Sequence, residues 1–261
     1  MATDRSLELQ QLARRVADAL PPEVTDVVLT GSTSHGLADA DSDVELLVVS
    51  ERLPEELPLG DLDSWDPGIE GAMWYGGFFE GEFVELIWWP PAHVEERVGA
   101  IAVGSIVDHQ RLRTAEAIVN GIPLRGERHA VWVGRLARYP DGLAAAIVAD
   151  AVLDWFDQSR SYRSLLREGD ALVLAQRLAQ DAEQILRVVF ALNEEWEPGW
   201  KRLPQRLEAL AVKPERLAER VDAAVRALDP QAMRELAAET LALAPQTDGT
   251  RRARSLLEQP L

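Results

Sequence analysis

The side-chain pattern of this chain changes abruptly at Pro90 and Pro91. Before them lie short runs rich in valine and tryptophan, bounded by glycine, proline and aspartate, a pattern typical of strands and tight turns. After them come alanine, leucine, arginine and glutamate, with apolar residues at helical spacing. With 261 residues the chain can form two cores. We therefore expect a mixed α/β domain at residues 1–98 and an all-α helical bundle at residues 99–261.

Within this division, individual elements can be placed from periodicity and from the residues that end them. The expected elements are a helix at 5–20, strands at 24–31 and 43–50, a loop from 51 to 69, paired strands at 71–79 and 82–90, and helices throughout 100–261, the clearest within 170–196. The paired strands are expected to join at Glu80 and Gly81.

Composition narrows the chemistry that the chain can use. It has no cysteine, so any metal must be held by carboxylates, histidines or phosphate oxygens, which favours hard cations. The formal charge of -17 repels polyanions, so a nucleic-acid partner is not expected, whereas a cationic small molecule would be attracted. No apolar run approaches the roughly 18 residues needed to cross a bilayer, and no secretory signal is present, so we expect a cytoplasmic protein with no membrane partner.

Three carboxylates lie in or beside apolar strand segments. Asp43 and Glu45 are two residues apart, so in a strand they project from one face, with Cα atoms about 6.6 Å apart. Glu85 has Phe83 and Ile87 as its neighbours on one face, and an unpaired charge there would be costly. If the two strands are adjacent, the three acids converge on one spot that suits one or two Mg²⁺ ions.

The turn before Asp43 offers groups that bind phosphate. Gly31 lets the backbone approach a ligand closely, and Ser32 and Ser34 supply hydroxyls. Free backbone N–H groups in such a turn can hold phosphate oxygens. The turn is therefore expected to hold phosphates beside the metal ions.

The stretch GSTSHGLADADSDVEL, residues 31–46, resembles the signature of the DNA polymerase beta-like nucleotidyltransferase superfamily, and the later VEL resembles its third-strand acid. The Asp-x-Glu form and the helical second half are similar to bacterial antibiotic nucleotidyltransferases of the kanamycin type. The resemblance implies catalytic and metal-binding roles for Asp43, Glu45 and Glu85, with Mg²⁺ as cofactor and an NTP, expected to be ATP, as donor. His35 stands where relatives often carry arginine, and is a further candidate for phosphate contact.

In the helical half, ALNEEWEPGWKRLP, residues 191–204, resembles an Asn, aromatic, Lys pattern near the nucleotide in bacterial relatives. Asn193 and Lys201 are therefore candidates for positioning the nucleotide and neutralising its phosphates, with Arg187 as a third.

Most candidates also have a purely structural interpretation. In that interpretation Asp43 and Glu45 lie on a solvated edge strand, where their charges discourage aggregation, and Glu85 pairs with a structural arginine. His35 would be a loop residue, Asn193 the polar end of a helix, and Lys201 a solvated charge. Trp74, Trp88 and Trp89 are expected to lie in the core.

The predicted function is transfer of a nucleoside monophosphate from an NTP to a hydroxyl of a small cationic acceptor, such as an aminoglycoside, with release of pyrophosphate; antibiotic resistance would follow. Glu85 either completes the metal shell or accepts the hydroxyl proton. Two alternatives stay open: transfer to tRNA or protein, as in toxin-type enzymes, and a non-catalytic nucleotide-binding module. The sequence gives no oligomeric state.

Overall fold

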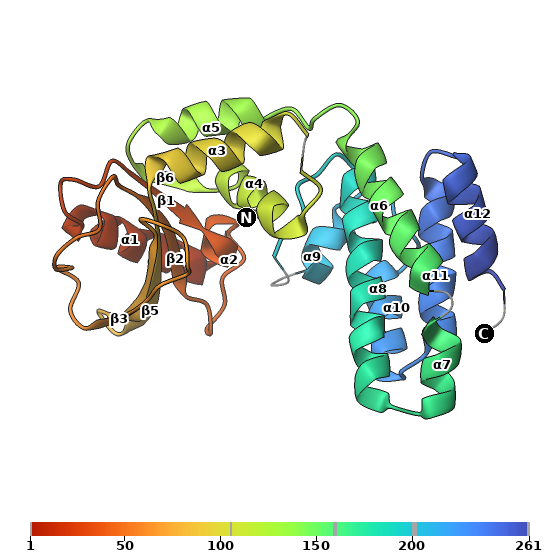
Figure 1. Cartoon of the computed structure of the whole chain (residues 1–261). Coiled ribbons are helices and arrows are strands. Elements are labelled where there is room, and N and C mark those ends of the chain that lie inside the picture. The colour runs from red at the N-terminus through yellow and green to blue at the C-terminus, as the bar shows by residue number, and fades with distance from the viewer. Residues whose placement is uncertain (1, 105, 159–160, 200–202, 260–261) are drawn as a thin grey trace. The chain divides into compact units, whose positions relative to one another are not determined.

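The computed structural model describes residues 2–104, 106–158, 161–199 and 203–259 (Figure 1). The chain divides into two compact units. Unit 1 comprises Met1–Ser105, Gln110–Arg138 and Pro198–Arg202, and unit 2 comprises Ile106–His109, Tyr139–Glu197 and Leu203–Leu261. A mixed sheet dominates the first and helices the second, which confirms the expected fold class.

Unit 1 is built on a six-stranded sheet with the strand order β3-β4-β5-β2-β1-β6. Its elements are α1 (Asp4–Ala19), β1 (Asp26–Thr30), α2 (Gly31–Ser34), β2 (Val44–Val49), β3 (Leu62–Trp65), β4 (Met73–Phe79), β5 (Glu82–Trp89), α3 (Pro91–Ala102), α4 (His109–Val119), β6 (Ile122–Arg125) and α5 (Arg128–Leu136). Neighbouring strands are antiparallel except for β2 and β5, which pair in parallel in the middle of the sheet.

The two faces of the sheet are distinguished by the alternation of side chains along its strands. One face carries Leu29, Leu46 and Leu86, which pack in a buried cluster with apolar residues of α1 such as Leu9 and Leu12. The opposite face carries Glu45 and Glu85, and we call it the carboxylate face. Alternation along β2 and β5 therefore separates the core side of the sheet from the side that carries the candidate acids.

The paired strands at 71–79 and 82–90 are confirmed as β4 and β5, with Phe79 opposite Glu82. Glu80 and Gly81 form the turn between them and have φ of 51° and 86°. Such positive φ values at both central residues match the right-handed twist of a hairpin.

Unit 2 consists of helices in the residues that the structure describes. They are α6 (Leu143–Gln158), α7 (Ser161–Glu168), α8 (Ala171–Leu192), α9 (Leu203–Glu208), α10 (Leu217–Arg226), α11 (Pro230–Leu243) and α12 (Asp248–Leu257). The N-cap residue of the long helix α8 is Asp170, whose side chain accepts hydrogen bonds from the backbone N–H groups of Leu172 and Val173. Its apolar residues, among them Ile185 and Val189, lie in the buried cluster shared with α6 and α11.

Two strands were not expected from the sequence. Strand β6 lies within the segment expected to be helical, so that expectation is wrong there; it is an edge strand, where Pro123 is tolerated. Strand β3 lies within the expected loop and has only four residues. Because β6 pairs with β1, unit 1 continues past residue 98 as far as Arg138.

None of the helices in the described part of the chain is both long enough and apolar enough to span a membrane.

Candidate active site

The parallel pairing of β2 with β5 brings two of the three candidate carboxylates together. In this register Glu45 is the direct partner of Glu85. Adjacent strands lie about 4.8 Å apart, and paired residues project from the same face. Both side chains are half-buried. The expected convergence of the Glu45 and Glu85 strands is thus present in the backbone.

The turn after β1 lies directly against Glu45. Gly31 begins the one-turn helix α2 with φ of 69°, a conformation that favours glycine. A Cβ atom added to Gly31 would lie 2.9 Å from Oε2 of Glu45. Only a residue without a side chain therefore fits between the turn and the carboxylate without displacing one of them.

Two threonine hydroxyls tie this turn to the strand that carries the acids. Thr33 donates from Oγ1 to the backbone oxygen of Asp43 at 3.0 Å, and Thr30 donates from Oγ1 to the backbone oxygen of Glu45 at 3.2 Å. Asp43 itself precedes the first residue of β2 and is half-buried. The hydroxyl contacts fix the spacing between the turn and both acidic residues.

The candidate phosphate ligands of the turn have partners within unit 1. Ser34 donates from Oγ to the backbone oxygen of Gly31 at 2.9 Å, and Ser32 donates to the hydroxyl of Ser42 at 3.4 Å. His35 lies 2.8 Å, measured from Nε2, from Oε1 of Glu116 on α4. A phosphate contact by His35 therefore has to compete with this carboxylate.

The donor chemistry of Asp43, Glu45 and Glu85 fits Mg²⁺, which prefers oxygen ligands. The register of Glu45 and Glu85, with space left for Oε2 of Glu45 by Gly31, fits as well. As the side chains stand, however, no group of three or more acidic or histidine side chains among the described residues has the arrangement of a metal site. The backbone positions suit the ion, and binding requires the carboxylates to turn towards it.

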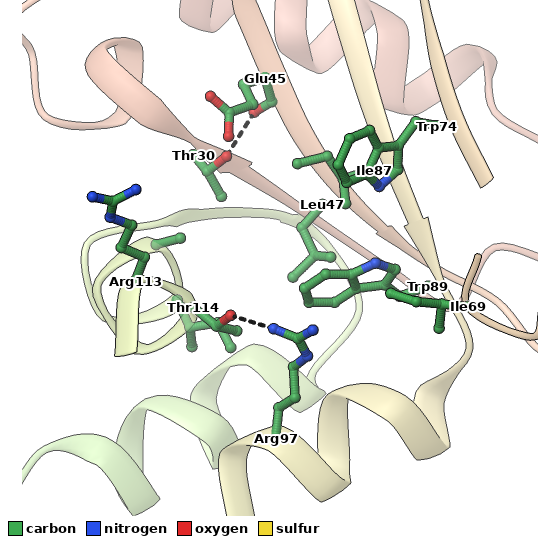
Figure 2. Close-up of a pocket in the computed structure, with 12 residues that line it drawn as sticks. Thr30, Glu45, Leu47, Ile69, Trp74, Ile87, Trp89, Arg97, Arg113 and Thr114 are labelled. Atoms are coloured by element: carbon green, nitrogen blue, oxygen red, sulfur yellow. Dashed lines mark hydrogen bonds between the residues drawn. The ribbon is translucent and has the colours of Figure 1, made fainter. Parts of the chain in front are cut away.

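A cavity of about 350 Å³ continues from Glu45 along the carboxylate face (Figure 2). Sheet residues form one side of it, and residues of α3 and α4 form the other. It is lined by Thr30, Glu45, Leu47, Ile69, Trp74, Ile87, Trp89, Arg97, Arg113, Thr114, Ala117 and Ile118. This volume is at the lower end of the range for small-molecule sites, about 300–1,000 Å³.

Arg97 is held in place at this cavity by three contacts. Its guanidinium lies over the ring of Trp89, 4.8 Å from the centroid, and donates to Oγ1 of Thr114 at 3.3 Å. Its Nε donates to Nε2 of His93 at 2.9 Å. Burial, and next the charge of Arg97, lower the pKa of His93 below its ordinary value, so its ring stays a neutral acceptor.

Two of the candidates from the second half of the sequence, Arg187 and Asn193, lie in unit 2. Arg187 is 6% exposed and donates to Val107 (2.6 Å), Gln184 (2.9 Å) and Asp150 (3.2 Å). Its guanidinium therefore already supports the interior of this unit.

Asn193 is the C-cap residue of α8 and bonds the backbone with both ends of its amide. Its Nδ2 donates to Val189 and Val212 at 2.7 and 2.8 Å, and its Oδ1 accepts from Ala211 and Val212 at 3.0 and 2.9 Å. Lys201 lies outside the described residues. Nucleotide contacts by these residues stay predictions.

Several residues at the site were not singled out from the sequence. Arg97, Arg113 and Glu116 come from helices that reach the sheet through long-range packing, and no local motif marks them. Trp88 and Trp89 are buried as expected, whereas Trp74 is half-buried. Trp89 also lines the cavity, together with Trp74. One signal in the sequence could have placed Trp89 at the site. Trp89 follows Glu85 by four residues in the same strand, and residues an even number apart along a strand project from the same face.

Comparison with known proteins finds a match for the region that holds these acids. Residues 9–107 match the family model of the nucleotidyltransferase domain. No curated protein matches the chain significantly. Among solved structures, the chain is similar to a nucleotidyltransferase-like protein from Exiguobacterium sibiricum, with 13% identity over 97% of this chain and 73% of the other. Their TM-score of 0.41 is too low to establish a shared fold.

The matched residues include the Gly31 turn, both central strands and all three candidate carboxylates. A nucleotidyltransferase domain implies an NTP as substrate. The match over residues 9–107 confirms the enzyme class expected from the sequence, a nucleotidyltransferase.

Proposed function

We propose that this enzyme transfers a nucleoside monophosphate from an NTP, with ATP the expected donor, to a hydroxyl of a small cationic acceptor such as an aminoglycoside. The observation that carries the proposal is the placement of Glu45 directly opposite Glu85, with Gly31 against the Glu45 carboxylate, inside the matched domain. Modification of an antibiotic in the cytoplasm, where NTPs are available, would give resistance.

In this reaction the acceptor oxygen forms a bond to the α-phosphorus of the NTP. The bond from that phosphorus to the oxygen bridging to the β-phosphate breaks, and pyrophosphate leaves. The acceptor's hydroxyl proton passes to a carboxylate or to solvent. Glu85 is the candidate base, because it is the register partner of Glu45 on the neighbouring strand.

Asp43, Glu45 and Glu85 are the residues that would hold one or two Mg²⁺ ions. When bound, the ions would neutralise charge that develops on the phosphates during displacement. The turn amides, Ser32 and Ser34 would hold the β- and γ-phosphates, with their present bonds to Ser42 and to Gly31 exchanged for bonds to the ligand.

The cationic nature of the acceptor is proposed from charge. The chain carries a formal charge of -17, and the carboxylate face brings two glutamates together. An ammonium group near them would be favoured, whereas a polyanion such as tRNA would be repelled over most of the surface.

A pyrophosphate-release screen tests the proposal. Each of the four NTPs is incubated with Mg²⁺ and an aminoglycoside, a lincosamide or tRNA, and we expect release with ATP and the aminoglycoside. Release only with tRNA would reject the small cationic acceptor, and Mg²⁺-dependent NTP binding without release for any acceptor would support a non-catalytic module instead.

A matched pair of variants connects the activity to the site. Glu45→Gln removes one charge from the carboxylate face, and Glu51→Gln makes the same change at an exposed position beyond the other end of β2. We expect Glu45→Gln to lower release by at least about 100-fold and Glu51→Gln to leave it within about twofold. Equal effects would contradict the assignment.

A further inference from the structure

Two hydrogen-bond donors at the cavity beside Glu45 are left without a protein partner. Nε1 of Trp74 and Nε1 of Trp89 are both buried and have no hydrogen-bond partner among the residues that the structure describes. Trp89 is only 9% exposed, and both side chains line the cavity. In Figure 2 each indole nitrogen lies on the side of its ring that faces the other tryptophan. A buried polar group without a partner is costly, so it indicates a missing ligand or solvent atom.

Comparison with Trp88 shows that an unpartnered indole N–H indicates a ligand site only where it adjoins a cavity. Trp88 also has an unpartnered Nε1, but it lies on the opposite face of β5 among apolar core residues. It is 1% exposed and does not line this cavity. Trp74 and Trp89 differ because they share one open volume of about 350 Å³.

The charges around the cavity also favour an electron-rich occupant. Two arginines line it, Arg97 and Arg113, whereas its one acidic lining residue among those described is Glu45, next to the candidate metal site. The hydroxyl of Thr114 already accepts from Arg97. The remaining walls are apolar, with Leu47 and Ile87 from the sheet and Ile118 from α4. An ammonium group placed beyond Glu45 would lie beside the two arginines, and the described lining offers it no second carboxylate.

We propose that this cavity binds the non-reacting end of the acceptor, and that this end is an apolar body bearing a carbonyl or carboxylate oxygen. The oxygen accepts hydrogen bonds from the indole N–H groups of Trp74 and Trp89. The apolar body packs against Leu47 and Ile87. This assignment of the occupant rests on the proposed transfer reaction, but the existence of the subsite does not.

The proposal changes what kind of acceptor the enzyme selects. The hydroxyl to be modified and any cationic group lie at Glu45 and Glu85, while the cavity takes the part without positive charge. A cationic acceptor that also presents a part without positive charge satisfies both the acidic edge and the cavity. The preferred acceptor is therefore two-ended, with the donor-lined cavity selecting one end and the carboxylates the other.

Three small probes with one shared ring test the subsite without any transfer reaction. Benzamide and benzoate carry an accepting oxygen, and benzylamine carries an ammonium group. Each is titrated into the ¹⁵N-labelled protein, whose eight tryptophans give eight indole N–H signals. We expect benzamide and benzoate to shift the Trp74 and Trp89 signals with a Kd on the order of 1 mM, and benzylamine to leave them unchanged.

Conservative variants assign the signals and test the hydrogen bonds. Trp89→Phe keeps most of the apolar surface and removes the donor, so benzamide should bind roughly fivefold more weakly. Trp74→Phe provides the same test at a half-buried position if Trp89→Phe fails to fold. Trp88→Phe is the matched control, because it removes an unpartnered donor from the other face and should leave binding unchanged.

Three results would overturn the subsite: benzylamine binding as well as benzamide, no shift of either indole signal, or full affinity in both cavity variants. Competition separates the subsite from the reaction. An acceptor that supports pyrophosphate release should displace benzamide. If it does not, the occupant is wrong although the transfer reaction stands; if the probes bind and no acceptor supports release, the transfer reaction fails while the subsite stands.

Discussion

Replacing Gly31 by alanine tests whether the close approach of the turn to Glu45 matters for function. The new Cβ would lie 2.9 Å from Oε2 of Glu45, against an ordinary contact of 3.4 Å or more, so the carboxylate oxygen must move by about 0.5 Å. Because that oxygen is at the end of a flexible side chain, the movement costs little stability. The main cost is the positive φ of 69°, about 1–2 kcal/mol for a residue with a Cβ.

Gly68→Ala is the matched control. Gly68 has φ of 74° and nothing within 4 Å of an added Cβ, so it carries the same backbone penalty with no steric contact. A domain stable by about 5–15 kcal/mol that loses 2 kcal/mol is still more than about 99% folded. Both variants should therefore be folded at 25 °C, and a difference in their activity reports on the carboxylate.

The assays are urea denaturation for the free energy of unfolding and pyrophosphate release for activity. We expect both variants to lose about 1–2 kcal/mol. Gly31→Ala should in addition lose at least about tenfold in release, because misplacing a reacting group by fractions of an ångström is costly. Equal activity of the two variants would refute the idea that Gly31 sets the position of Glu45.

Three further predictions concern single residues. Asp43→Asn should abolish nearly all pyrophosphate release while its thermal midpoint changes by only a few degrees; an active Asp43→Asn enzyme would contradict the mechanism. The pKa of His93 in the folded protein lies below its ordinary 6.5, so the unfolded chain binds a proton at this ring more readily than the folded protein does. The stability that the neutral ring contributes is therefore complete above pH 6.5 and falls as the pH drops through that value. His93→Gln should remove this part of the pH dependence of the free energy of unfolding, measured by denaturation curves. Asn193→Ala breaks four bonds to backbone and should lower the free energy of unfolding by about 2–4 kcal/mol, with NTP affinity of the folded protein unchanged; a selective loss of affinity, measured by calorimetry, would instead support a nucleotide contact.

The parts of the site that could be predicted from sequence depend on local geometry. Residues two apart in a strand share a face, so the common side of Asp43 and Glu45 follows from spacing alone. The neighbouring position of Glu85 was only a condition at the level of sequence, and the register of β2 and β5 meets it by pairing Glu85 with Glu45. The positive φ of Gly31 is likewise a local consequence of glycine in a tight turn.

The parts that could not be predicted depend on contacts between distant segments. Strand β6 has four residues and contains Pro123, which locally argues against a strand, and only its edge position beside β1 permits it. The contact of His35 with Glu116 joins residues 81 positions apart through the packing of α4, which no pattern near either residue encodes. The donor character of the cavity is also collective, because it arises from two tryptophans on different strands.

The parallel pairing of β2 with β5 has a consequence for how the enzyme could be divided. The hairpin of β1 and β2 carries the phosphate turn and two acids, and the hairpin of β4 and β5 carries the third; each is closed by antiparallel pairing of its own. The backbone pairing between these two hairpins is the single row that joins β2 to β5, whose paired residues are 40 positions apart. Pairing of β6 with β1 and the shared apolar cluster would also hold the two fragments together. A chain cut in the exposed segment near residue 55 would leave each fragment inert by itself. Recovered activity on mixing would then report fragment association, which makes this fold a candidate for a split reporter.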